Sequence, residues 1–151
     1  MEYISVEEFF EQDERARDKL LKWWMPQKGD ICYHISDKWM FICNSYYPDY
    51  TEQYKDKDLI EYNNFSKYDT YYRNTCIPLL TEGQLREIIK EYFGFDCKVE
   101  LEWCNGGYQV NTVSKINDEK VFAEFPTNET EPLKAYWNVV LDIINKVIME
   151  L

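Results

Sequence analysis

The sequence predicts an α+β fold: an antiparallel sheet of about four to five strands packed against two or three helices, with a long tyrosine-rich insertion. Three observations predict it. Short segments rich in β-branched and aromatic residues alternate with turn residues, other segments repeat apolar residues at helical spacing, and 45% of the chain is apolar. Because a length of 151 residues fits one hydrophobic core, we expect residues 1–151 to form a single domain.

The first amphipathic segment begins at Ser5. Ser5 and Glu8 have the spacing of a capping box, in which each side chain accepts a hydrogen bond from the backbone of the other residue. Pro26 disfavours a helical residue before it. We therefore expect one helix from Ser5 to just before Pro26, whose apolar stripe is Phe9, Phe10, Ala16, Leu20, Leu21 and Trp24.

Two strands follow a turn at Gly29-Asp30. Residues 31–35 and 39–43 are rich in β-branched and aromatic side chains, and the polar link between them is short, so they predict a hairpin. Their near-continuous apolar character indicates burial on both faces, at least in part. His34, the only histidine, lies in the first strand, and we interpret it as a neutral, hydrogen-bonded residue rather than a catalytic base.

A capped helix and a second hairpin are predicted in the next part of the chain. Thr81 is suited to the N-cap of a helix that ends at Gly94. Residues 99–112 alternate between apolar and polar on either side of Asn105-Gly106-Gly107, which predicts a half-exposed hairpin. Glu100 and Glu102 share one face of its first strand. They can hold a cation or contact an arginine-rich partner, or they can simply be solvated.

A further strand over residues 121–125 follows a turn at Asn117-Asp118. The closing helix should begin near Thr130 or Glu131. Pro132 then falls in its first turn, where proline is favoured because its missing N–H is not needed there.

Residues 44–75 are polar and dense in tyrosine, with no clean period of 2 or 3.6. We expect an irregular loop with room for at most one short helix. Tyrosines interleaved with carboxylates are typical of recognition surfaces and can contact arginine and lysine through cation–π and ionic pairs. The predicted partner-binding residues are Tyr46, Tyr47, Asp49, Tyr50, Glu52, Tyr54, Asp56, Asp58, Glu61, Tyr62, Tyr68, Asp69, Tyr71 and Tyr72. The alternative is that these rings pack on the core as a cap.

The charge balance, 17 basic against 28 acidic residues, gives −11. This excess repels nucleic acid and anionic lipid, and it suits docking on a basic protein surface or serves only solubility. The sequence has no apolar run long enough to span a bilayer and no basic, apolar leader at its start. We therefore expect no membrane partner and a cytoplasmic location.

Little in the sequence favours catalysis. Glycine-rich phosphate-binding loops are absent, and the five cysteines form no C-x-x-C pair that would indicate zinc or a disulfide framework. We expect buried thiols, no cofactor, no metal and no enzymatic activity. An active site made only of carboxylates that meet in the fold stays open.

Three stretches together carry a resemblance: Trp24-Met25-Pro26 leading to Gly29-Asp30, residues 77–85 at the start of the second helix, and Leu133 to Trp137 in the last helix. This combination resembles small phage- and prophage-encoded proteins of low-GC Gram-positive bacteria. The resemblance implies expression in a bacterial host, where anti-defence functions such as anti-CRISPR inhibition are common. It covers framework residues, and no site residue is carried over from it.

These observations support three hypotheses. The first is an acidic inhibitor that mimics nucleic acid and occupies the basic channel of a host defence nuclease. The second is a sponge that sequesters a nucleotide signal without turnover, through a basic pocket from Lys98, Lys115 and Lys120, or from Arg73 and Arg86. The third is a homo-oligomeric accessory protein.

Overall fold

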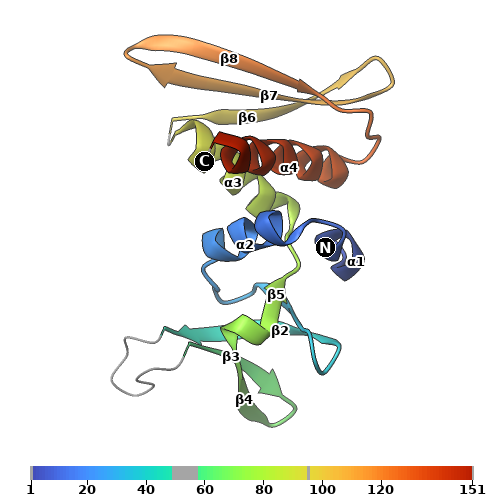
Figure 1. The fold of residues 1–151 in the computed structure, drawn as a ribbon, viewed down its shortest axis with the longest axis vertical. Coiled ribbons are helices and arrows are strands. Elements are labelled where there is room, and N and C mark those ends of the chain that lie inside the picture. The colour runs from blue at the N-terminus through green and yellow to red at the C-terminus, as the bar shows by residue number, and fades with distance from the viewer. Residues whose placement is uncertain (1, 49–57, 95, 151) are drawn as a thin grey trace. The chain divides into compact units, whose positions relative to one another are not determined.

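The structure, a computed structural model, describes residues 2–48, 58–94 and 96–150. The α+β class is confirmed (Figure 1). The helices are α1 (Val6–Phe10), α2 (Glu14–Trp23), α3 (Glu82–Phe93), α4 (Pro132–Glu150) and the 3-10 helix η1 (Arg73–Thr75). The strands are β1 (Ile31–His34), β2 (Trp39–Tyr47), β3 (Leu59–Asn64), β4 (Lys67–Tyr72), β5 (Cys76–Pro78), β6 (Lys98–Cys104), β7 (Gly107–Ile116) and β8 (Glu119–Pro126).

The strands fall into two antiparallel sheets rather than one, and the chain divides into two compact units. Unit 1 comprises residues 1–4, 12–16 and 80–151, and unit 2 comprises residues 5–11 and 17–79. Each unit contains one of the sheets. The expectation of a single domain stays a prediction.

The N-terminal segment forms two helices, α1 and α2, so the prediction of one continuous helix is wrong. The capping box is present, because Ser5 and Glu8 exchange side chain to backbone hydrogen bonds of 3.1 and 3.2 Å. The helix ends after one turn and a half, and Asp13 then accepts a hydrogen bond of 2.8 Å from the N–H of Ala16. An aspartate in this position caps the new helix α2 and stabilises the break.

The sheet of unit 2 has the strand order β4-β3-β2-β1-β5. The predicted hairpin of β1 and β2 is confirmed, with Cys32 opposite Phe41 and His34 opposite Trp39. The turn between the two strands has four residues, and in it Lys38 has a left-handed conformation with a φ of 57°.

The expectation of an irregular loop over residues 44–75 is wrong for the described part of that segment. Strand β2 continues to Tyr47, and β3 and β4 form a hairpin in regular register from Leu59 opposite Tyr72 to Asn64 opposite Lys67. Period-2 alternation is hidden in the sequence because tyrosines occupy both faces of the strands. Pairing with neighbouring strands therefore stabilises the extended conformation even though the side-chain pattern does not predict it.

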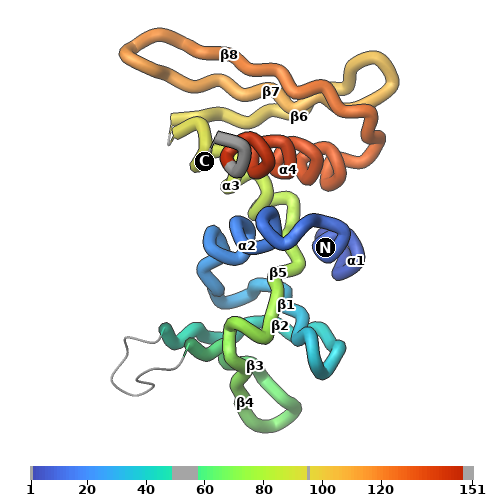
Figure 2. Tube along the Cα trace, in the orientation of Figure 1, coloured from blue at the N-terminus to red at the C-terminus, as the bar shows by residue number. Residues whose placement is uncertain are grey.

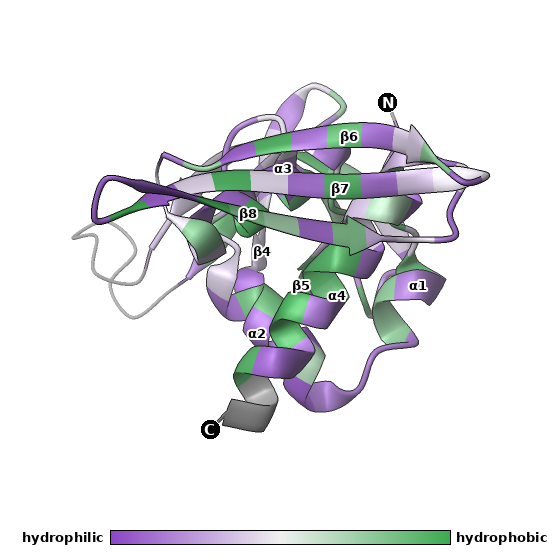
Figure 3. Cartoon of the chain, turned by 90° about the horizontal axis from the view of Figure 1, so that it is seen from above, coloured by the Kyte–Doolittle hydropathy of each residue, from purple (hydrophilic) through white to green (hydrophobic). Residues whose placement is uncertain are grey.

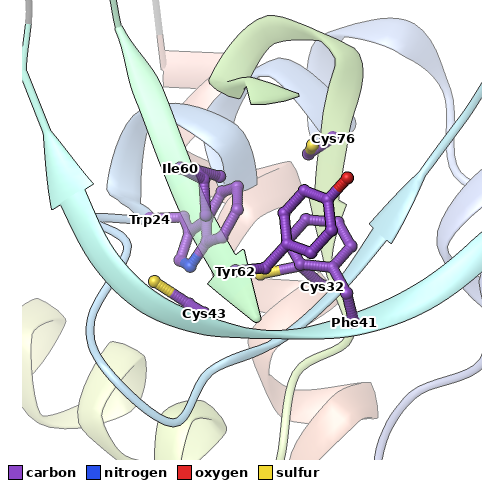
Figure 4. Close-up of a cluster of buried hydrophobic side chains, with 7 residues drawn as sticks. All are labelled: Trp24, Cys32, Phe41, Cys43, Ile60, Tyr62 and Cys76. Atoms are coloured by element: carbon purple, nitrogen blue, oxygen red, sulfur yellow. The ribbon is translucent and has the colours of Figure 1, made fainter. Parts of the chain in front are cut away.

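The core of unit 2 gathers seven buried side chains between α2 and one face of the sheet (Figure 4). Trp24 is its largest member, at 1% exposure, and its Nε1–H donates to Asp30 Oδ2 at 3.0 Å. Full burial of a large apolar side chain contributes roughly 1.5–3 kcal/mol. The other members are Cys32, Phe41, Cys43, Ile60, Tyr62 and Cys76.

Unit 1 has the sheet order β6-β7-β8, with α3 and α4 covering one face (Figure 2). The predicted cap at Thr81 is present, because its side chain accepts from the N–H of Gln84 and Gln84 reaches back to the Thr81 backbone. The predicted hairpin turns at Asn105 and Gly106, which have φ values of 53° and 83°. Gly107 packs so closely on the chain that a Cβ there would lie 2.9 Å from the carbonyl oxygen of Thr127.

Candidate functional site

The predicted partner-binding tyrosines of unit 2 divide between the two faces of its sheet. Side chains alternate along a strand, and residues opposite each other in the register share a face. Three of the tyrosines therefore share the core face with Ile60 and Cys43: Tyr46, Tyr62 and Tyr71. The opposite face receives Tyr47, Tyr68 and Tyr72. The predicted residues Asp49, Tyr50, Glu52, Tyr54 and Asp56 lie outside the described residues.

The core-facing tyrosines form the packed cap that was the alternative expectation. Tyr62 is 4% exposed and stacks on Tyr71 with ring centroids 4.9 Å apart. Tyr71 in turn stacks on His34 at 3.7 Å. Burial, followed by a hydrogen bond to Tyr71, raises the pKa of the Tyr62 phenol well above its usual value. The prediction that Tyr62 contacts a partner is therefore wrong, since its ring is inside the unit.

The Tyr71 hydroxyl connects β4 to the β1–β2 hairpin. It accepts a hydrogen bond from Trp39 Nε1 at 2.7 Å and donates one to Asp37 Oδ2 at 2.5 Å. One side chain thus joins three strands by stacking and hydrogen bonding together. Tyr71 therefore contributes to the fold, and its predicted contact with a partner stays a prediction.

His34 is 7% exposed, and its Nδ1 accepts a hydrogen bond of 2.9 Å from the backbone N–H of Asp37. A ring nitrogen that accepts from an N–H is unprotonated, so this geometry assigns the proton of a neutral imidazole to Nε2. The interpretation of His34 as a hydrogen-bonded residue is confirmed.

A hollow of about 190 Å³ lies beside this ring, lined by His34, Leu59, Thr70, Tyr71, Tyr72 and Thr75. Pockets for nucleotide-sized ligands usually span roughly 300–1,000 Å³. This hollow is smaller than such pockets.

Arg73, the one basic residue of unit 2 named for the sponge hypothesis, is already engaged. Its Nη2 donates to the carbonyl oxygens of Leu21, at 2.6 Å, and Trp24, and its Nη1 lies 3.7 Å from Asp58 Oδ2. These contacts hold the arginine at the end of α2. They also occupy Asp58, which was predicted to contact a partner.

The face of the five-stranded sheet opposite its core, called the outer face from here on, carries several exposed apolar side chains. Met40 is 47% exposed, Ile42 54%, Tyr68 61% and Tyr72 52%. The β1–β2 hairpin was expected to be buried at least in part on both faces; on this face Ile31 and Tyr33 are partly buried, and Met40 and Ile42 are exposed. Exposed apolar side chains that share one face of a sheet can form an interaction site. The register places Tyr33, Met40, Ile42, Tyr47, Glu61, Tyr68 and Tyr72 on the outer face. It also places Leu59 and Ile77 there, and these two side chains are buried.

A single carboxylate, that of Glu61, lies among these side chains. Its Oε1 accepts from Asn44 Nδ2 at 2.8 Å, and its Oε2 accepts from the Tyr47 hydroxyl at 3.2 Å. Asn44 reaches it because β2 bulges between Cys43 and Ser45. The negative charge of Glu61 is thus held in a fixed orientation on a surface of aromatic rings.

The β3–β4 hairpin ends in Phe65, whose side chain is 97% exposed at a φ of 60°. Asp69, a predicted partner-binding residue, is exposed on the same hairpin. The sequence interpretation missed Phe65, Met40, Ile42 and Tyr33. For Phe65 the sequence did contain a signal, because Asn63-Asn64 before it is a turn sequence between two tyrosine-containing runs, and a turn exposes its side chains.

Charge is not concentrated in the segment predicted to bind a partner. Residues 44–75 contain six acidic and four basic residues, so they carry −2 of the −11 of the chain. This share is close to their share of the length. The negative charge is therefore a property of the whole chain, while the outer face contributes aromatic area and one oriented carboxylate.

Four of the five thiols are unsuited to nucleophilic chemistry. Cys32, Cys43, Cys76 and Cys97 are buried, and burial raises the pKa of each, to about 11 for Cys43 and Cys76. A thiol with a raised pKa carries little thiolate at neutral pH. Within residues 2–48, 58–94 and 96–150, no three His, Cys, Asp or Glu side chains are grouped as metal ligands are.

No family model, curated protein or solved structure matches the chain. In the part of the chain that the structure describes, no helix has the length and apolar character needed to cross a bilayer.

Proposed function

We propose that the protein is a non-catalytic binding protein, and that the outer face of unit 2 holds an arginine-rich surface of a protein partner. The observation that carries this proposal is the Glu61 carboxylate, held by Asn44 and Tyr47 among exposed tyrosines. A guanidinium can pair with this carboxylate while it stacks on a neighbouring phenol ring. Few other side chains satisfy both features of the site.

The partner class follows from this chemistry and from the net charge of −11. Arginine-rich surfaces are typical of proteins that bind nucleic acid, and a strongly acidic chain approaches them faster than a neutral one. The function expected from the sequence, inhibition of a host nucleic-acid-targeting defence protein, requires such a partner. We therefore keep it as the proposed function.

Affinity and encounter rate should depend on different residues. Exposed tyrosine and methionine side chains, such as Tyr68, Tyr72 and Met40, supply contact area on the outer face. The distributed carboxylates act at long range, where salt screens them. Raising the ionic strength should therefore slow association more than it speeds dissociation.

The test is to measure binding kinetics of the purified protein against a panel of host defence nucleases with basic nucleic-acid channels. For the nuclease that binds, Tyr68→Ala and Tyr72→Ala should each weaken the dissociation constant by about tenfold, since such anchors contribute 1–2 kcal/mol. Glu61→Gln keeps the shape of the side chain and removes its charge, so it should weaken binding as well.

Ile116→Ala is the matched control, because Ile116 is 55% exposed but belongs to unit 1. We expect it to leave the affinity unchanged. The proposal fails if Ile116→Ala weakens binding while the three outer-face variants do not, or if the association rate proves independent of salt. If mass spectrometry detects a nucleotide released when the purified protein is denatured, the sponge hypothesis is favoured instead.

A further inference from the structure

The three-stranded sheet of unit 1 has one face that no helix covers. Along β6 and β7, hydrophilic and hydrophobic residues alternate (Figure 3). The apolar set, including Val99 and Val110, faces α3 and α4 and is buried. The remaining side chains form the opposite side of the sheet, called the charged face from here on.

The register divides the charged face into four rows, because residues opposite each other share a face. Starting at the β7–β8 turn, the rows are Lys115 with Lys120; Lys98 with Val113 and Phe122; Glu100 with Asn111 and Glu124; and Glu102 with Gln109 and Pro126. Two hydrogen bonds confirm that the polar side chains share this side, from Gln109 to Asn111 and from Asn111 to Glu102, each 2.8 Å long. One half of the face is therefore basic and the other half acidic.

These charges and one large apolar side chain are accessible. The three lysines and three glutamates are exposed, and Phe122, in the row beside the boundary between the halves, is 68% exposed. Among the residues that the structure describes, none of the six charged side chains takes part in an ion pair within the chain. The six charged side chains are therefore accessible to a partner, and the exposed Phe122 ring lies among them.

We propose that the charged face binds the charged face of a second copy of the protein, forming a two-fold symmetric dimer. A half-turn about an axis in the plane of the sheet and perpendicular to the strands reverses the strand direction of the second copy. The basic half of each copy then lies on the acidic half of the other, and the two Phe122 rings come close to the two-fold axis at the β8 edge. The contact is self-complementary, as a two-fold interface requires.

The division of the charged face into a basic half and an acidic half favours a second copy of the protein as its partner. A nucleic acid or another polyanion would pair with Lys98, Lys115 and Lys120 but would be repelled by the glutamates along the same strands. A purely basic partner would meet the opposite problem. A second copy in reversed orientation satisfies both halves at once, and the copy in parallel orientation would place lysine on lysine.

The test is sedimentation velocity of the full chain over a range of concentrations and salt. We expect a reversible dimer that weakens as salt rises. Two variants reverse one half each: Lys98→Glu with Lys120→Glu, and Glu100→Lys with Glu124→Lys. Each should weaken self-association by about tenfold or more, because every substitution acts twice in a two-fold contact.

Two combinations decide the geometry. All four substitutions in one chain leave Lys115 and Glu102 in place but reverse the sign of the net charge on each half, so they should restore the dimer, which also shows that the substituted sheet still folds. Mixing the two half-reversed variants should give a heterodimer, because one face then carries five acidic side chains beside Lys115 and the other carries five basic side chains beside Glu102. The control is Lys28→Glu with Lys67→Glu, which reverses two exposed charges of unit 2 and should leave the dimer unchanged.

A protein that remains monomeric at all concentrations overturns the proposal. A dimer that survives both half reversals overturns it too, because its contact then lies elsewhere, for example along an edge strand of either sheet. Failure of the half-reversed variants to form a heterodimer excludes a contact between two charged faces. None of these outcomes bears on the outer face of unit 2, so the proposed function is tested separately.

Discussion

Tyr71 shows how one side chain of the tyrosine-rich segment contributes to the fold of unit 2. Its ring lies between His34 and Tyr62, and its hydroxyl bonds to Trp39 and Asp37. The ring contributes by packing and the hydroxyl by hydrogen bonds, and the two contributions can be separated by a single substitution.

We predict that Tyr71→Phe lowers the free energy of unfolding by about 0.5–1.5 kcal/mol per hydrogen bond lost. The loss should be near the lower value, because Trp39 and Asp37 can form hydrogen bonds with water instead. Urea denaturation monitored by circular dichroism measures the change. Tyr68→Phe is the matched control, since Tyr68 is 61% exposed on the same strand, and it should change stability by less than about 0.5 kcal/mol. Equal effects of the two substitutions would contradict the role assigned to the Tyr71 hydroxyl.

At the scale of the elements, η1 is tied to the end of α2 by one arginine. Arg73 lies over the Trp24 ring at 5.8 Å and donates to the carbonyl oxygens of Leu21 and Trp24. The last carbonyls of a helix have no partner within the helix, and a positive charge near them is favourable. Arg73 therefore supplies both the hydrogen bonds and the charge that the end of α2 needs.

We predict that Arg73→Met lowers the free energy of unfolding by about 2–3 kcal/mol, because charge-assisted hydrogen bonds to part-buried carbonyls are lost. Arg73→Lys keeps the charge but not the planar fork of donors, so it should recover only part of the loss. Urea denaturation of both variants at pH 7 is the measurement. A lysine variant as stable as the original protein would show that charge alone is sufficient.

At the scale of the whole molecule, buried thiols and phenols make stability sensitive to alkali. Burial raises the pKa of Cys43 and Cys76 from 9.0 to about 11, and it raises the pKa of Cys32 and Tyr62 further. Between these values the folded protein holds protons that the unfolded chain has released. The free energy of unfolding should therefore be steady below pH 9 and fall from pH 9 to 11.

Urea denaturation at intervals from pH 7 to pH 11 measures this fall. Cys43→Ala with Cys76→Ala should make the decline between pH 9 and 11 shallower, whatever its effect on stability at pH 7. Cys104→Ser, at the one exposed cysteine, should leave the slope unchanged. A slope that does not respond to loss of Cys43 and Cys76 would show that other groups dominate the alkaline transition.

Local signals predicted most of the framework. The caps at Ser5 and Thr81 and the turn at Asn105-Gly106 could be located because each depends on residues within a few positions of one another. The break between α1 and α2 was missed because the apolar stripe continues across it, and the Asp13 cap competes with that stripe. The β3–β4 hairpin was missed because tyrosine occurs on both of its faces, which removes the alternation that predicts a strand.

The candidate site was predicted in part. Composition alone indicated that the tyrosines and carboxylates near Glu61 were unusual, and Tyr68 and Tyr72 are indeed exposed. Which rings face the core depends on strand register, and register is set by contacts between segments far apart in the sequence. For the same reason Met40 and Ile42, which the sequence indicated as buried, lie on the exposed side.

By itself, the sequence determined the α+β class, the helix caps, the tight turns and the acidity of the chain, because each depends on neighbouring residues or on composition. Tertiary structure alone decided the partition into two sheets, the inward and outward faces of the tyrosine-rich strands, and the rows of lysine and glutamate on the charged face. These features follow from which strands pair and in what register. A shift of one residue would exchange the two faces, and that choice is made by the packing of the whole unit.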